Sequence, residues 1–154
     1  MLDSIPFDFR PREIEAIDGA AAASADPAIL AGIDPGLPAN GFSLRWQGNE
    51  AQLRFADSAA ESYARRLIDG LSEYIRSERV EIPALALRDW PDFVHRGYML
   101  DVSRDRVPTM QRLRQLVDEL ARLRYNELQL YTEHTFAFSG HDMAWGDASP
   151  YTAA

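Results

Sequence analysis

Short runs of alternating apolar and polar residues dominate the first half of the chain. Residues 42–46 and 51–55 alternate in the way that half-buried strands do. The polar residues between the two runs are typical of a turn, so the pair predicts a β-hairpin. A shorter alternation at residues 12–17 and the run at residues 82–87 predict two further strands.

A helical pattern follows the predicted hairpin. Ser58 and Glu61 have the spacing of a capping box, which marks the start of a helix. Apolar residues then recur at the helical period along one stripe: Ala60, Tyr63, Ala64, Leu67, Ile68, Leu71, Tyr74 and Ile75. Residues 19–38 are rich in Ala, Gly, Asp and Pro, and predict a loop with a short helical turn at 27–31. Together these elements predict a small α+β layer, in which a helix covers an antiparallel sheet.

The second half has a different pattern. Residues 97–102 are nearly continuously apolar, which predicts a strand buried on both faces. Pro108 and Thr109 begin an amphipathic helix that we expect to end at Asn126, and residues 127–132 predict a second strand. Strand, helix and strand form a βαβ unit, whose two strands run parallel. A long polar and aromatic loop follows at residues 135–150.

The change of pattern predicts two domains. The boundary falls near residues 89–93, where Trp, Pro and two aspartates interrupt the periodic runs. We therefore expect a small α+β domain at residues 1–92. Residues 93–154 then hold one βαβ unit and the loop that follows it.

Candidate chemistry lies directly after the two parallel strands. Functional groups of parallel α/β folds gather at the carboxyl ends of strands. This rule selects Arg104 after the first strand, and Glu133 and His134 after the second. Neighbouring strands lie about 5 Å apart, so the three side chains could converge on one ligand. Arginine donates well to sugar hydroxyls or to a carboxylate.

Structural roles compete with this interpretation. Arg104 and Glu133 could form only an ion pair between strand ends. Asp101 lies within an apolar strand, which predicts a buried and hydrogen-bonded structural carboxylate. The spacing of His134 and His141 fits no compact metal-binding signature, so no metal site is predicted. The aromatic side chains of the loop either stack on a sugar or hold the loop in place: Phe136, Phe138 and Trp145.

Composition narrows the classes of function. The formal net charge of −8 argues against nucleic-acid and anionic-membrane partners, which require a basic face. No apolar stretch is long enough to span a bilayer, and the first twelve residues lack a signal-like apolar region, so we expect a cytoplasmic protein. There is no cysteine, every basic residue is arginine, and no nucleotide-binding fingerprint occurs, so no cofactor is predicted.

One segment is recognisable. Residues 96–104, Arg-Gly-Tyr-Met-Leu-Asp-Val-Ser-Arg, resemble the opening barrel strand of the family 20 glycoside hydrolases, the β-N-acetylhexosaminidases. The following helix and residues 125–131 are similar to that family's first barrel helix and second strand. Residues 131–136, with Gly140, His141, Trp145 and the Ser149-Pro150 pair, resemble one branch of the family.

The resemblance implies an α+β domain followed by the start of a (β/α)8 TIM barrel, with about two of its eight strands in this chain. It also implies removal of terminal β-linked N-acetylglucosamine or N-acetylgalactosamine from a glycan by substrate-assisted, retaining catalysis. Arg104 matches the family's arginine that binds sugar hydroxyls. Glu133 and His134 occupy the place of a pair of sugar-binding aspartates.

The family's catalytic Asp-Glu pair follows the fourth barrel strand, whereas this chain ends after the second. A whole barrel takes about 250 residues. We therefore expect an N-terminal part of a hexosaminidase, without catalytic residues and inactive alone. The alternatives are a non-catalytic carbohydrate-binding or interaction module, and a purely structural docking domain. No sequence feature fixes an oligomeric state.

Overall fold

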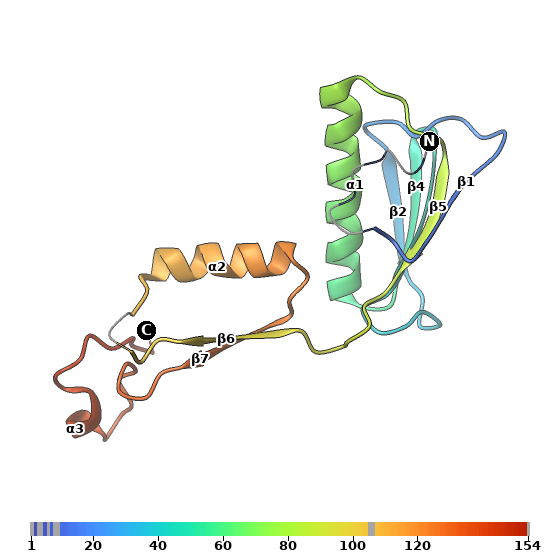
Figure 1. Cartoon of the computed structure of the whole chain (residues 1–154). Coiled ribbons are helices and arrows are strands. Elements are labelled where there is room, and N and C mark those ends of the chain that lie inside the picture. Colours follow the sequence, from blue (N-terminus) through green and yellow to red (C-terminus); the bar gives the residue numbers. More distant parts are fainter. Residues whose placement is uncertain (1, 3–4, 6, 8–9, 105–106, 154) are drawn as a thin grey trace. The chain divides into compact units, whose positions relative to one another are not determined.

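The protein divides into two compact units, Met1–Val94 and His95–Ala154. The computed structural model describes residues 2, 5, 7, 10–104 and 107–153. Figure 1 traces the elements along the chain.

The first unit is a five-stranded mixed sheet covered on one face by a long helix (Figure 1). The spatial order of the strands is β1 (Glu13–Ala16), β5 (Leu85–Asp89), β3 (Phe42–Gln47), β4 (Glu50–Phe55) and β2 (Ala28–Ile33). Helix α1 (Ser58–Glu78) packs on β3 and β4. The predicted covering of the sheet by a helix is therefore confirmed, although the sheet is mixed and not the predicted antiparallel one.

Strands β3 and β4 form the predicted hairpin. They pair antiparallel with Trp46 opposite Ala51, and Gly48 takes a left-handed φ of 52° in the turn. Alternate residues point to α1 and are buried, as the period-2 pattern requires: Phe42, Leu44, Trp46, Ala51, Leu53 and Phe55. These side chains and the stripe of α1 make up the core of the unit.

Helix α1 follows its predicted stripe, with Ala60, Ala64, Ile68 and Leu71 buried. The predicted cap is wrong, because Asp57 rather than Ser58 is the N-cap. Asp57 has extended backbone angles, and its carboxylate accepts the Ala60 amide at 2.9 Å. Ser and Asp are both good caps, and the position at which the chain leaves β4 selects between them. Within the described part of the chain, no helix has both the length and the apolarity to cross a membrane.

One strand of the sheet was not predicted from the sequence. Residues 28–33 form β2, in place of the predicted loop and helical turn, and pair in parallel with β4. The sheet is therefore mixed and not purely antiparallel. This segment, Ala-Ile-Leu-Ala-Gly-Ile, has no alternation because β2 is an edge strand with several exposed side chains. Pairing with β4 stabilises it where local propensity does not.

The two remaining strands of the first unit are close to the prediction. The run at 12–17 forms β1, which pairs antiparallel with β5. The predicted strand at 82–87 is shifted toward the carboxyl end, because β5 begins at Leu85. Ile82 instead makes an isolated bridge with Ala23, and is buried there.

The second unit contains the predicted βαβ unit. Strands β6 (Gly97–Asp101) and β7 (Glu127–Tyr131) pair in parallel, with α2 (Met110–Arg122) between them in the chain. Thr109 caps α2 through a bond from the Arg112 amide to its hydroxyl, at 3.2 Å. The helix ends at Arg122, before the predicted Asn126, because Arg124 turns into the left-handed region with φ 63°.

The predicted double-sided burial of the first strand of this unit is not found in the described residues. Tyr98 and Met99 of β6 are exposed, the latter by 61%. Among the described apolar residues of this unit, the buried ones are Val102, directly after the strand, and Leu113 and Leu120 on one stripe of α2. A short helix, α3 (Asp142–Trp145), lies in the predicted final loop.

Candidate sugar-binding site

The carboxyl ends of β6 and β7 lie side by side. Their parallel register pairs Asp101 with Tyr131, and the Val102 amide donates to the Tyr131 carbonyl at 3.0 Å. The residues that follow the two strands therefore leave the sheet at the same edge. Two of the three predicted ligand residues, Arg104 and Glu133, meet there.

The Arg104 guanidinium lies between two carboxylates. Its Nη2 is 3.6 Å from Glu133 Oε1, and its Nε is 3.6 Å from Asp101 Oδ2. The Arg104 side chain is 72% exposed, so solvent screens both pairs and they contribute little stability. The two carboxylates therefore orient a guanidinium that still presents donors to solvent. The ion pair expected between the strand ends is present.

Asp101 is held by its own chain neighbours. Its Oδ1 accepts bonds from the Ser103 hydroxyl at 2.7 Å and from the Ser103 amide at 2.8 Å. These bonds and the nearby Arg104 hold the pKa of the Asp101 carboxyl below its usual value. The predicted hydrogen bonding is confirmed, but the predicted burial is wrong. The side chain is 41% exposed because the described residues leave this face of β6 uncovered.

Tyr131 joins the site through Glu133. Its hydroxyl donates to Glu133 Oε1 at 2.7 Å, and this bond to a carboxylate raises the pKa of the phenol. Glu133 turns into the left-handed region with φ 44°, directly after the strand. The sequence analysis did not select Tyr131. The available signal was its place at the end of β7, two residues before Glu133.

His134 lies in a different environment. It lines a hollow of about 600 Å³ together with Val107, Met143 and Asp147, whereas the ion pairs of Arg104 are with Asp101 and Glu133. The structure therefore joins Arg104 to Glu133 but gives His134 separate neighbours. Met143 lies on α3 and Asp147 just after it, in a segment where no periodic pattern identifies them in the sequence.

The aromatic loop after β7 is held by contacts between its own residues. The Trp145 indole N–H donates to the Phe138 carbonyl at 3.0 Å, and the Phe136 and Phe138 rings lie 4.8 Å apart. Tyr151 anchors the end of the loop, because its hydroxyl donates to the Pro108 carbonyl at 2.6 Å. These contacts favour a loop-holding role for Trp145 over sugar stacking. Within the residues that the structure describes, no three metal-binding side chains are grouped together.

The arrangement suits recognition of a polyhydroxylated ligand. A guanidinium donates to neighbouring hydroxyls, and a carboxylate beside it accepts a hydroxyl proton. Both groups meet at the strand ends, from Arg104 and Glu133, which are 29 positions apart in the chain. The low pKa of Asp101 makes this carboxylate an acceptor at neutral pH and not a general acid.

Comparison with known proteins gives a consistent picture. No protein-family model matches the chain, and no curated protein matches it significantly. Solved structures do match. A β-N-acetylhexosaminidase crystal structure superposes on 91% of this chain with a TM-score of 0.74 and 21% identity. A family 20 β-N-acetylglucosaminidase covers 82% with a TM-score of 0.63 and 25% identity. An exo-β-N-acetylglucosaminidase from Vibrio harveyi, solved with N-acetylglucosamine, covers 82% with a TM-score of 0.60 and 15% identity.

The resemblance to the family 20 β-N-acetylhexosaminidases is therefore confirmed at the level of structure. The small α+β unit with its mixed sheet matches the N-terminal domain of these enzymes. The chain spans 30%, 29% and 25% of the length of the three structures, in the order given.

Proposed function

We propose that this chain is the N-terminal part of a retaining β-N-acetylhexosaminidase. In this proposal the first unit is the domain that precedes the barrel, and β6, α2 and β7 begin the catalytic (β/α)8 barrel. The substrate is a glycan that ends in a β-linked N-acetylhexosamine. Similarity to solved hexosaminidases supports the family relationship.

The observation that carries the proposal is the position of Arg104. It lies at the carboxyl edge of two parallel strands, where the active sites of barrel enzymes gather. Asp101 and Glu133 hold its guanidinium from two sides, each at 3.6 Å. In the proposed site Arg104 donates to hydroxyls of the terminal sugar. Glu133 accepts a hydroxyl proton beside it, whereas His134, which lines a separate hollow, follows Glu133 only in the chain.

The reaction itself requires groups that these two strands do not supply. In the substrate-assisted mechanism the acetamido oxygen of the substrate attacks the anomeric carbon, while a glutamic acid protonates the leaving oxygen. An aspartate beside that glutamic acid orients the acetamido group. The proposal assigns both carboxylates to a segment after a fourth barrel strand. The role of this chain is then to bind the sugar and to begin the barrel.

Two experiments test the proposal. We expect the 154-residue chain to show no turnover of a chromogenic β-N-acetylglucosaminide above the uncatalysed rate. We also expect the coding DNA past codon 154 to encode further strand–helix repeats, with an Asp-Glu pair after the fourth strand. Turnover by the 154-residue chain that Arg104→Ala abolishes would contradict the assignment of the catalytic groups.

A carbohydrate-binding module without catalysis is the second candidate. The orientation of Arg104 by two carboxylates favours it, because this arrangement needs no catalytic pair to bind hydroxyls. A module of this kind would bind N-acetylglucosamine at millimolar concentration in an NMR titration of the 154-residue chain. Binding would be lost in Arg104→Ala and kept in Arg114→Ala, an exposed arginine of α2. An immediate stop codon, together with this binding, would favour the module over the enzyme.

A further inference from the structure

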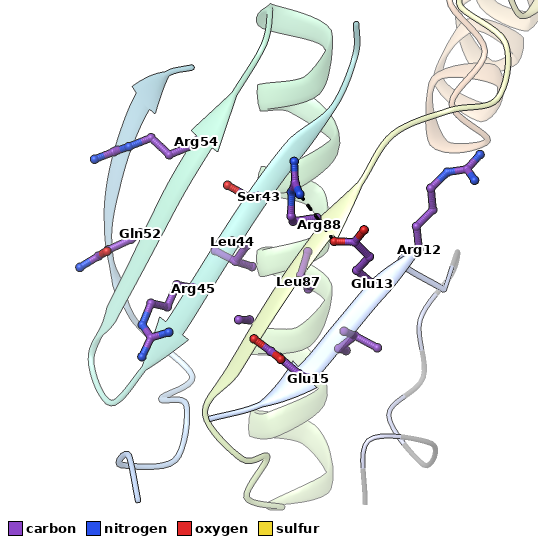
Figure 2. A pocket seen from close by; sticks show the side chains of 12 residues that line it. Arg12, Glu13, Glu15, Ser43, Leu44, Arg45, Gln52, Arg54, Leu87 and Arg88 are labelled. Atoms are coloured by element: carbon purple, nitrogen blue, oxygen red, sulfur yellow. Dashed lines mark ion pairs between the residues drawn. The ribbon is translucent and has the colours of Figure 1, made fainter. Parts of the chain in front are cut away.

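The face of the first unit that α1 does not cover carries a second candidate site. A hollow of about 650 Å³ lies on this side of the sheet, across β1, β5, β3 and β4 (Figure 2). Figure 2 shows the polar side chains around the hollow, with α1 behind the sheet. The short side chains of Ser43 and Ala86 leave the space open, because the longer side chains stand around them.

Three arginines surround the hollow on three neighbouring strands. Arg88 on β5 and Arg54 on β4 both lie directly opposite Ser43, one on each side of β3. Arg45 lies two residues along β3 from Ser43, on the same face. The strand register therefore places the Cα atoms of the three arginines at the corners of a triangle, about 8 to 10 Å apart. Arginines at this spacing repel one another and do not stabilise the sheet.

The structure leaves these guanidinium groups largely available. Among the described residues, Arg45 has no ion pair or hydrogen bond. Arg54 donates from a single nitrogen, Nη1, to the carbonyls of Leu30 and Leu53. Arg88 lies 3.8 Å from Glu13, at the rim of the hollow, in an exposed and therefore weak ion pair. Arg88 also lies 5.9 Å from the centre of the Trp90 ring, so Arg45 and Arg54 are the two arginines of the hollow without an ion pair among the described residues.

Hydrogen-bond acceptors lie beside the arginines. Glu15 lines the hollow and, in the part of the chain that the structure describes, has no ion pair. The Gln52 amide lies directly opposite Arg45 and, like the Ser43 hydroxyl, both donates and accepts. A ligand made of carboxylates alone would meet repulsion from Glu15. A ligand with both carboxylates and hydroxyls could satisfy the arginines and Glu15 together.

We propose that this face binds an acidic oligosaccharide, a glycan segment whose sugar rings carry carboxylate groups. The carboxylates bind Arg45, Arg54 and Arg88, and hydroxyls of the same rings donate to Glu15. The volume of the hollow is in the range of sites that hold small ligands. This site lies entirely within the first unit. It is independent of the N-acetylhexosamine site proposed at the ends of β6 and β7.

Titration of the 154-residue chain with tetragalacturonic acid tests the proposal, because this probe has carboxylates and hydroxyls but no acetamido group. We expect binding that weakens with rising salt, since the contacts are exposed to solvent. The double variant Arg45→Gln/Arg54→Gln should weaken it by roughly tenfold or more, as expected for lost charge-assisted bonds. Arg66→Gln/Arg114→Gln removes the same charge from exposed helix positions and should leave binding within about twofold.

Several outcomes would overturn the proposal. One is the absence of binding at millimolar probe concentration, and another is an equal loss in both double variants. Equal binding of neutral cellotetraose would also overturn it, because the arginines would then not select the ligand. Hexaglutamate that binds as tightly as the acidic sugar would instead indicate a docking face for an acidic protein segment. Thermal melting of both double variants checks that each remains folded.

Discussion

The two units of this protein bury their apolar residues to very different degrees. In the first unit a five-stranded sheet and α1 enclose a continuous core, with Trp46, Ala51 and Leu53 fully buried. In the second unit β6 and β7 form a two-stranded sheet whose residues are all partly or fully exposed. The first unit therefore encloses its own core, and the second leaves apolar surface open within the described residues.

The difference follows from the number of strands. A two-stranded sheet has too little apolar surface to be stable alone, whereas three or more strands packed on a helix can be. The apolar run at residues 97–102 is typical of a strand that other layers cover. In the proposed hexosaminidase, later barrel strands and helices would cover the open faces of β6 and β7.

The largest expected effect is a difference in stability loss between a core substitution in the first unit and an apolar substitution in β6. Leu53→Ala should destabilise the first unit by about 3 kcal/mol, because it removes a fully buried side chain from close-packed surroundings. Met99→Ala in β6 should cost less than about 0.5 kcal/mol, since that side chain is 61% exposed. Urea unfolding of both variants, followed through the indole NMR signals of Trp46 and Trp145, measures each unit separately. Similar losses of unfolding free energy in the two variants would contradict the difference in burial between the units.

A smaller effect concerns the cap of α1. Asp57→Ala should cost about 1 kcal/mol at neutral pH, because it removes the acceptor for the Ala60 amide. Burial raises the pKa of Asp57, but bonds from Ala60 and Asn40 outweigh it and leave the pKa below the ordinary value of 3.8. The charged carboxylate thus stabilises the folded state above pH 3.8, and this stabilisation is lost as the pH falls through the folded-state pKa. Urea unfolding at neutral and acidic pH measures the change.

Two variants serve as controls for the cap. Ser58→Ala should change stability by less than about 0.5 kcal/mol, because Asp57 and not Ser58 is the N-cap. Asp57→Asn keeps one oxygen for the Ala60 amide but puts a donor in place of the oxygen that accepts from Asn40, so it should remove the pH dependence and lose part of the stability. A larger loss of stability in Ser58→Ala than in Asp57→Ala would contradict this assignment and support the capping box predicted from the sequence.

The smallest expected effect is a titration shift in the second unit. The bond to Glu133 raises the pKa of Tyr131 above its ordinary value of 10.0. Glu133→Gln removes the negative charge, so the pKa of Tyr131 should fall toward 10.0. NMR titration of ring-labelled tyrosine measures this shift, with Tyr63 of α1 as an internal reference in the other unit. An unchanged Tyr131 pKa in the variant would contradict the contact at the proposed sugar site.

Regular elements with strong periodicity were predictable from the sequence. The hairpin of β3 and β4, the stripe of α1 and the order β6, α2, β7 all follow from spacing alone. The placement of Arg104 and Glu133 at one sheet edge also follows, because parallel strands end together. In each case the pattern repeats over several residues, so local chemistry and the final fold favour the same structure.

Other features required partners distant in sequence. The segment at residues 28–33 has no strand pattern of its own and becomes β2 only by pairing with β4. Asp101 has the sequence environment of a buried residue, but its exposure depends on what covers β6. His134 follows Glu133 directly, yet it lines a hollow built by the loop after β7.

The sequence by itself determined which segments have regular structure and which charged groups follow the parallel strands, because these properties depend on residue spacing along the chain. Tertiary structure decided the identity of the edge strand, the choice of Asp57 as cap and the grouping of three arginines around Ser43. Those features depend on which strands pair and in which register. Pairing is set by the free energy of the whole sheet and not by any one of its segments.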